Sequence, residues 1–309
     1  MVAELFPDET ENDEEKKGPD TGIAISVLGR PNVGKSTLVN RMIGEERVLT
    51  FDHPGTTRDS IRIPFQKNGK DYVLIDTAGV RRKSKVQDIV EKFSVLKSFD
   101  AIESAKIIIL VIDANEGVTE QDAALLGMIE NSGKSVIIAA NKWDGLDTYA
   151  KEQLKKQIER RFIFIDYAQY HFISALHGTG VGNLFKSIDK IYKSQQVAMS
   201  TSDMTNILES AVASHPPPMV RGRRIKLRYA HLGGHDPVRV IIHGNQTESV
   251  PDSYTKYLAK YFRKSLKLVG TPVLILYKQG DNPFKGKKNQ LTPRQITKRK
   301  RLMNFVKKR

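Results

Sequence analysis

The chain has 309 residues, of which 39% are hydrophobic, and a formal net charge of +15, so it has the length and apolar content for two domains with cores of their own. It contains no cysteine, which excludes disulfides, thiol catalysis and thiolate metal sites and is compatible with a reducing cytosol. No apolar run reaches the roughly 18 residues that a membrane span needs, and the acidic N-terminus lacks the pattern of a signal peptide, so we expect a cytoplasmic protein.

The chain opens with an acidic segment. Residues 4–20 hold eight acids and two lysines with almost no apolar side chain. Such a composition cannot bury enough surface to fold. We therefore expect residues 1–20 to form a disordered linker.

Short apolar runs then alternate with amphipathic stretches over residues 21–195. The first run, residues 23–28, is rich in β-branched side chains and ends at a glycine, which is typical of a buried strand, and a helix is expected at residues 38–43. Further strands are expected at residues 72–75, 107–112, 135–139, 162–164 and 171–173, with intervening helices at residues 122–131 and 151–161. This alternation predicts an α/β domain with a mostly parallel sheet covered on both faces.

A second, smaller domain is expected over residues 196–280. A linker at residues 197–202 leads into a helix at residues 204–213, for which Asp203 is the expected N-cap. After a run of three prolines, the expected elements are strands at residues 224–231 and 238–243, a helix at residues 252–267 and a strand at residues 272–277. The order αββαβ predicts a small α+β unit.

The positive charge is concentrated in the C-terminal third. Residues 196–309 carry 23 Lys/Arg against 6 Asp/Glu, whereas residues 1–195 carry 27 against 29. A field of one sign attracts polyanions, so nucleic acid is the favoured partner and an anionic membrane surface the alternative. The tail, residues 281–309, has eleven Lys/Arg and no acid from residue 285 onward, which fits either a disordered tail without a partner or an RNA-contacting arm.

Basic residues also alternate imperfectly with Ile225 and Leu227 in the first strand region of this domain. One face of such a strand can pack while the other stays basic. The candidate RNA-contacting or partner-contacting residues are Arg221, Arg223, Arg224, Lys226 and Arg228.

A phosphate-binding motif lies between the first strand and the first helix. The sequence GRPNVGKS at residues 29–36 fits G-x-x-x-x-G-K-S in the context that the motif requires. Its backbone N–H groups can face a β-phosphate, Lys35 can neutralise β/γ charge, and Ser36 can offer a hydroxyl to Mg²⁺. The predicted phosphate-binding residues are Gly29, Arg30, Pro31, Asn32, Val33, Gly34, Lys35, Ser36, Thr37, Asp76 and Gly79.

The base is indicated by the sequence NKWD at residues 141–144, directly after a predicted strand. Asp144 can accept hydrogen bonds from guanine N1–H and the exocyclic amine, whereas adenine would leave the carboxylate unpaired. Lys142 would lie along the base, and Asn141 would tie this loop to the phosphate loop. After the last strand come Ser174, Ala175 and Leu176, where the N–H of Ala175 could read guanine O6. Alone, each pattern also fits a surface turn, but their order favours a guanine-nucleotide site.

Two further loops are candidate switches. Asp76 begins the sequence DTAG at a strand end, where it can hold Mg²⁺ through water and the Gly79 N–H can meet a γ-phosphate. In the upstream loop PGTTRD, Thr57 is the expected Mg²⁺ ligand, with Thr56 as the adjacent alternative. Residue 80, where Ras-like GTPases place a glutamine that orients water, is Val80, and the basic run that follows it is either a solvated loop or a contact that follows the nucleotide state.

The motifs GRPNVGKST, PGTTRDS, DTAGVRRKSKV, NKWD and SALHGTGV resemble the second GTPase domain of the Der (EngA) family of bacterial ribosome-assembly GTPases. Residues 197–280 are similar to the KH-like C-terminal domain of that family. The family has two tandem GTPase domains, whereas this sequence has one P-loop, so the acidic leader resembles the end of the linker between them. The resemblance implies a P-loop NTPase fold of the Ras-like G-domain type, followed by a KH-like domain.

The resemblance also implies an activity. It implies hydrolysis of GTP to GDP and phosphate, with Mg²⁺, as a switch in assembly of the large ribosomal subunit, and a KH-like domain that contacts rRNA and on which a GTPase domain can dock. It implies that Asn32 helps bind K⁺ in place of a water-orienting glutamine. We expect a monomer that does not bind membranes. The alternative function is a G-domain regulator in tRNA modification or at a membrane surface.

Overall fold

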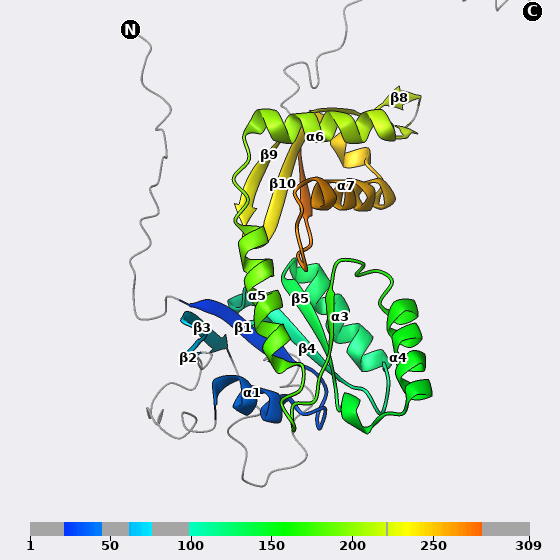
Figure 1. The fold of residues 1–309 in the computed structure, drawn as a ribbon. Coiled ribbons are helices and arrows are strands. Elements are labelled where there is room, and N and C mark those ends of the chain that lie inside the picture. Colours follow the sequence, from blue (N-terminus) through cyan, green and yellow to red (C-terminus); the bar gives the residue numbers. More distant parts are fainter. Residues whose placement is uncertain (1–21, 45–61, 76–98, 221, 280–309) are drawn as a thin grey trace, which may run out of the picture.

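The computed structural model describes residues 22–44, 62–75, 99–220 and 222–279, and both the predicted linker at residues 1–20 and the basic tail at residues 281–309 lie outside them. The first of its two units is built on a six-stranded sheet in the order β2-β3-β1-β4-β5-β6 (Figure 1). Its strands are β1 (Ile23–Leu28), β2 (Arg62–Lys67), β3 (Lys70–Ile75), β4 (Ile107–Asp113), β5 (Ser135–Asn141) and β6 (Gln169–Phe172). All neighbouring pairs are parallel except β2 and β3.

Helices cover both faces of this sheet. On one face α1 (Lys35–Ile43) and α5 (Val181–Gln195) pack against alternate residues of the central strands, and on the other face lie α3 (Glu120–Ser132) and α4 (Thr148–Arg161). Every residue of β4 and β5 is buried, as expected for central strands covered twice. The predicted α/β fold with a mostly parallel sheet is confirmed.

One predicted strand of this unit is wrong. Residues 162–164 follow α4 as a turn, and the sheet ends with β6 alone. Phe162 is the C-cap of α4 and is 1% exposed, and Ile165 is fully buried beside it. Phe162 thus fills the core beneath α4, whereas Ile163 and Phe164 are 77% and 40% exposed, so the run forms no strand.

The second unit is a three-stranded sheet with two helices on one face. The sheet order is β11-β10-β9, where β10 (Val238–Asn245) is antiparallel to β9 (Lys226–His235) and parallel to β11 (Leu274–Gln279). Helices α6 (Thr201–Ser214) and α7 (Asp252–Ser265) bury Leu208 and Phe262 against the sheet. The predicted order αββαβ is confirmed, and a 3-10 turn, η2 (Thr247–Ser249), precedes α7.

Two local predictions in this unit are wrong. The N-cap of α6 is Ser200, whose hydroxyl accepts a hydrogen bond from the N–H of Asp203. Because this hydroxyl pairs an N–H of the first turn, the helix begins three residues earlier than expected. The basic candidates do not share one strand, because β7 (Met219–Val220) and β8 (Arg223–Arg224) form a small hairpin before β9 begins at Lys226.

The two units meet through a buried polar contact at the start of β5. The hydroxyls of Ser135 and Thr271 lie 2.7 Å apart, both side chains belong to fully buried residues, and Gln195 donates to Ser135 over 2.8 Å. The N–H of Val136 donates to the carbonyl of Gly270 at 2.9 Å.

Ion pairs flank this contact. Lys134 binds Asp236 at 2.9 Å, and Asp166 accepts from Lys260 and Arg263 of α7. The second unit thus packs against the start of β5, the strand that ends at Asn141. Among the helices that the structure describes, none is long and apolar enough to cross a membrane.

Candidate nucleotide-binding site

The phosphate loop joins β1 to α1 through backbone that only glycine tolerates at two points. Gly29 and Gly34 have φ angles of 149° and 97°, and Asn32 between them has a φ of 63°. A Cβ on Gly34 would lie 2.2 Å from Nδ2 of Asn141, and one on Gly29 would lie 2.3 Å from the carbonyl oxygen of Val111. Side chains at either glycine would therefore break the loop, which ends at Gly34, the N-cap of α1, where a helix N-terminus favours an anion.

Lys35 is the first residue of α1 and folds back over the loop. Its ammonium donates to the backbone carbonyl of Arg30. Burial lowers the pKa of Lys35, because the charged form loses hydration there. An anion bound at the loop would stabilise the charged ammonium of Lys35 and so offset the hydration that burial removes. Lys35 therefore lies where the predicted phosphate contact needs it.

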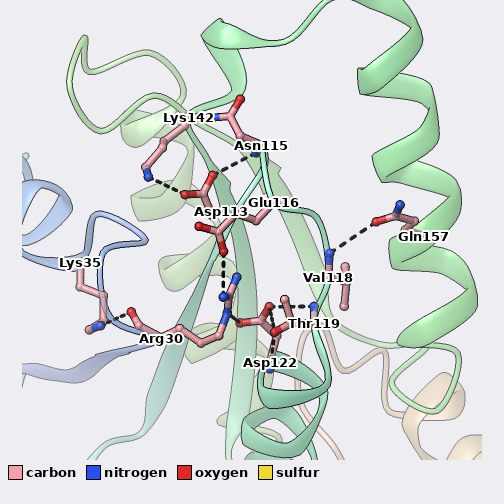
Figure 2. A network of polar contacts seen from close by, with 10 residues as sticks. All are labelled: Arg30, Lys35, Asp113, Asn115, Glu116, Val118, Thr119, Asp122, Lys142 and Gln157. Atoms are coloured by element: carbon pink, nitrogen blue, oxygen red, sulfur yellow. Dashed lines mark hydrogen bonds and ion pairs between the residues drawn. The ribbon is translucent and has the colours of Figure 1, made fainter.

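The Arg30 side chain does not face the phosphate side of the loop. Its guanidinium donates from Nε to Asp122 at 3.0 Å and from Nη1 to Glu116 at 2.8 Å (Figure 2). Asp122 is fully buried and also accepts from the N–H and hydroxyl of Thr119, which completes the capping box of α3. The predicted phosphate contact of Arg30 is therefore limited to its backbone, and its side chain anchors the loop to α3.

Asn141 connects three segments at the end of β5. Its Nδ2 donates to the carbonyl of Val33 and its Oδ1 accepts from the N–H of Ala175, both over 2.8 Å, and the residue is 3% exposed. The predicted tie between the NKWD loop and the phosphate loop is present. The Ala175 N–H, expected to read guanine O6, already donates to Asn141. The buried amide oxygen of Asn141 needs a donor, just as its nitrogen needs an acceptor.

The next residues of the loop face solvent. Lys142 has a left-handed φ of 65°, and its ammonium contacts Asp113 at the end of β4 (Figure 2). Asp144 lies in the 3-10 turn η1 (Trp143–Gly145). A hydrogen bond from Ser174 and a backbone hydrogen bond lower the pKa of Asp144, with a smaller effect from His177, whose Nε2 lies 3.4 Å from the carboxylate. Asp144 is thus held as an ionised, exposed acceptor.

Sequence reasoning missed Arg41, in the last turn of α1. Its Nε donates to the carbonyl of Ala175 at 3.3 Å and its Nη2 to the carbonyl of Leu176, so α1 holds the loop that follows β6. Leu176 itself is 67% exposed. The only signal in the sequence is a basic residue at the end of a helix, which is common for other reasons.

Several predicted site residues lie outside the described part of the chain: Thr56, Thr57, Asp76, Gly79 and Val80. Of the expected Mg²⁺ ligands the structure describes Ser36, which follows Lys35 in the first turn of α1, where a hydroxyl suits a hard cation. Asn32, the expected K⁺ ligand, is exposed at the rim of the loop. Pro31 is also exposed there, and Thr37 lies further along α1.

The candidate RNA-contacting residues lie on the second unit. Arg224, Lys226 and Arg228 are exposed on β8 and β9. Arg221 and the side chain of Arg223 lie outside what the structure describes.

We expect Arg41→Ala to weaken binding of a fluorescent GDP by about tenfold, or about 1.4 kcal/mol, because the loop after β6 loses its two hydrogen bonds to α1. Arg160→Ala, which removes an exposed arginine from the end of α4, is the matched control and should bind GDP like the parent. Equal affinity of the Arg41 variant and the parent would show that α1 does not position this loop.

Known proteins resemble the chain in both units. The family described as "50S ribosome-binding GTPase" matches residues 24–142, and the family described as "KH-domain-like of EngA bacterial GTPase enzymes, C-terminal" matches residues 199–278. GTPase Der of Tolumonas auensis is 56% identical over 305 residues, which cover 97% of this chain and 61% of the relative. GTPase Der of Teredinibacter turnerae is 56% identical over 309 residues, which cover 100% of this chain and 67% of the relative.

Among solved structures, Era of Aquifex aeolicus bound to GDP and AlF4⁻ is 20% identical with a TM-score of 0.43, covering 84% of this chain and 94% of Era, a likeness too distant to bear on function. The chain spans about 60% of the length of the first curated relatives. By its match to those relatives, the chain belongs to the Der (EngA) family of GTPases.

Proposed function

We propose that the chain binds GTP and hydrolyses it to GDP and phosphate, as a switch in assembly of the bacterial large ribosomal subunit. The observation that carries the nucleotide part is the position of Asp144. Its exposed, ionised carboxylate stands at the end of the strand whose last residue, Asn141, is bonded to the phosphate loop. A nucleotide whose phosphates rest on this loop would present its base edge to that carboxylate.

Discrimination follows from the chemistry of the carboxylate. Guanine offers N1–H and an amine to the two oxygens of Asp144, whereas adenine offers an unprotonated N1 and would leave a carboxylate stripped of water without a partner. Ser174 and Lys142 position the carboxylate and the adjoining backbone. For the Ala175 N–H to read O6, guanine must share it with Asn141.

Hydrolysis rests on charge neutralisation around the β- and γ-phosphates. Lys35 and the N–H groups of the loop would stabilise the charge that spreads over the phosphoryl oxygens. Ser36, with Thr57 and Asp76, would hold a Mg²⁺, which supplies further positive charge there. Contacts of the γ-phosphate with Thr57 and Gly79 would order two loops that loosen after hydrolysis.

Val80 carries no group that could orient the attacking water, so another source of positive charge is needed. We propose that Asn32 contributes an amide oxygen to a K⁺ beside the phosphates. The left-handed backbone of Asn32 turns this residue to the exposed rim of the loop. A monovalent cation there would act as an arginine finger does.

Hydrolysis should be at least about tenfold faster in KCl than in NaCl at equal ionic strength, because one electrostatic stabiliser of the transition state is present only in the former. Asn32→Gly, which keeps the positive φ and removes the amide, should abolish the difference. Asn206→Ala, an exposed asparagine of α6, should keep it. Equal rates of the parent in the two salts would contradict the potassium site.

The partner proposed for the second unit is ribosomal RNA of the large subunit. Its support is the charge of residues 196–309, 23 Lys/Arg against 6 Asp/Glu, with Arg224, Lys226 and Arg228 exposed on β8 and β9, which are consecutive in the chain. We propose that Arg221 and Arg223 extend this basic edge. We further propose a monomer divided at residues 195–196, whose KH-like unit accepts a further GTPase domain in longer relatives.

Co-sedimentation with isolated ribosomal subunits, with GDP or a non-hydrolysable GTP analogue over a salt series, tests this partner. We expect binding to the large subunit that depends on the nucleotide and falls with salt. Replacing Arg224, Lys226 and Arg228 together by glutamine should weaken it and reduce the salt slope by about 0.7 to 0.9 for each phosphate that the protein no longer neutralises.

The matched control replaces three exposed cations of α4, Lys156, Arg160 and Arg161, by glutamine. It should bind like the parent. No co-sedimentation in either nucleotide, or an equal weakening in both triple variants, would contradict the proposed rRNA contact.

A further inference from the structure

The three-stranded sheet of the second unit has an open face. Alternate residues of β10 point to the helices and are buried, among them Val240 and Ile242, whereas Ile241 and His243 point the other way. The strand pairing places Tyr229 opposite His243, and His231 opposite Ile241, on the same open side. On β11 the matching positions are Leu276 and Lys278. We name these six residues the open face: Tyr229, His231, Ile241, His243, Leu276 and Lys278.

Aromatic rings stand side by side on this face, each turned toward its neighbour across the strands. The rings of Tyr229 and His243 are stacked, with centroids 4.3 Å apart and planes 10° from parallel, although they come from different strands. The ring of His231 follows at 5.3 Å from that of His243. Tyr229 is 42% exposed and Leu276 46%, so one side of the tyrosine ring and an apolar side chain remain open to solvent.

Hydrogen bonds fix the two imidazoles. Nδ1 of His231 lies 3.0 Å from the carbonyl of Leu232, which can only accept, so this nitrogen carries a proton. Nε2 of His231 can then accept from Nε2 of His243, 3.2 Å away. Burial, His231 and Lys278 lower the pKa of His243, which favours its neutral ring. Rings that hydrogen bonds already hold in place lose little conformational entropy when another ring stacks on them.

The surroundings of the face are cationic. Strands β9, β10 and β11 contain no Asp or Glu, and their Lys/Arg residues are Lys226, Arg228, Arg239 and Lys278. Six residues beyond β11, the sequence begins a stretch with eleven Lys/Arg and no acid. A face with stacked rings at its centre and only positive charges on its own strands complements a chain with planar bases and a phosphate backbone.

We propose that the open face is a base-stacking platform that binds single-stranded RNA, with a base stacked on the side of the Tyr229 ring that His243 leaves uncovered and Lys278 beside the phosphates. The proposal rests on the proposed RNA-binding function and names the surface that would carry it. No two glycines in residues 196–309 are three positions apart, so the chain lacks a G-x-x-G loop, and the platform supplies a different way to hold a strand. A double helix would not present its bases to such a face.

The full chain should be titrated against a fluorescein-labelled 12-nucleotide single-stranded RNA by anisotropy at several salt concentrations. Tyr229→Leu should weaken binding by roughly 5- to 100-fold, the effect of losing one base stack, without changing the salt slope. Tyr229→Phe should keep near-parental affinity, because the ring remains. Lys278→Gln should instead lower the salt slope by about 0.7, the value of one phosphate contact on a single strand.

Tyr149→Leu, which removes a more exposed tyrosine from α4, is the control for removal of any surface ring and should bind RNA like the parent. A 2-aminopurine in the RNA should be quenched by the parent and not by Tyr229→Leu. Unchanged affinity and quenching in Tyr229→Leu would overturn the platform, as would an equal weakening in Tyr149→Leu, and would leave the face to a protein partner. One outcome separates the two proposals. If Tyr229→Leu binds RNA like the parent while the triple glutamine variant of Arg224, Lys226 and Arg228 does not, the platform fails and the proposed rRNA contact stands.

Discussion

The two hydrogen bonds of the Asn141 side chain hold the nucleotide site together. One amide, buried at the end of β5, donates to the phosphate loop at Val33 and accepts from the loop after β6 at Ala175. Neither bond can be replaced by water, because the residue is 3% exposed. In such surroundings an unmade hydrogen bond costs about 1–3 kcal/mol, so the three loops adopt one mutual arrangement. The glycine at position 34 follows from the same contact, since a Cβ there would collide with the amide.

Strand β5 connects the loops around Asn141 to the second unit. Its last residue is Asn141, and its first, Ser135, is bonded to Thr271 and Gln195 in the contact between the units. All seven residues of the strand are buried, so its position is fixed along its whole length. The loop predicted to read the base and the contact with the KH-like unit therefore lie at opposite ends of one rigid strand. A basic surface on the second unit is in this way held at a fixed orientation to the candidate nucleotide site.

The sequence predicted the parts of the structure that local patterns govern. Apolar runs of β-branched residues identified the central strands. Gly29 and Asn141 at strand ends, with Gly34 at the start of the first helix, identified the loops that meet. Some failures are local, such as the N-cap of α6 and the turn after α4, and others depend on a neighbour distant in sequence. Residues 162–164 have the composition of a strand, yet only Phe162 is buried, as the C-cap of α4. Arg30 turns away from phosphate since the fully buried Asp122, 92 residues later, binds its guanidinium. Arg41 and the stacked pair of Tyr229 and His243 likewise become visible only when separate elements are brought together.

The central claim is that Asp144 reads guanine while the phosphates rest on the loop around Lys35. It is tested most directly by displacing a fluorescent GDP from the purified chain with unlabelled GDP or ADP. A guanine-reading carboxylate predicts that GDP displaces the probe at concentrations roughly 10⁴-fold lower than ADP does, and that Asp144→Asn removes most of this difference. Equal displacement by the two nucleotides, or no binding of either, would contradict it.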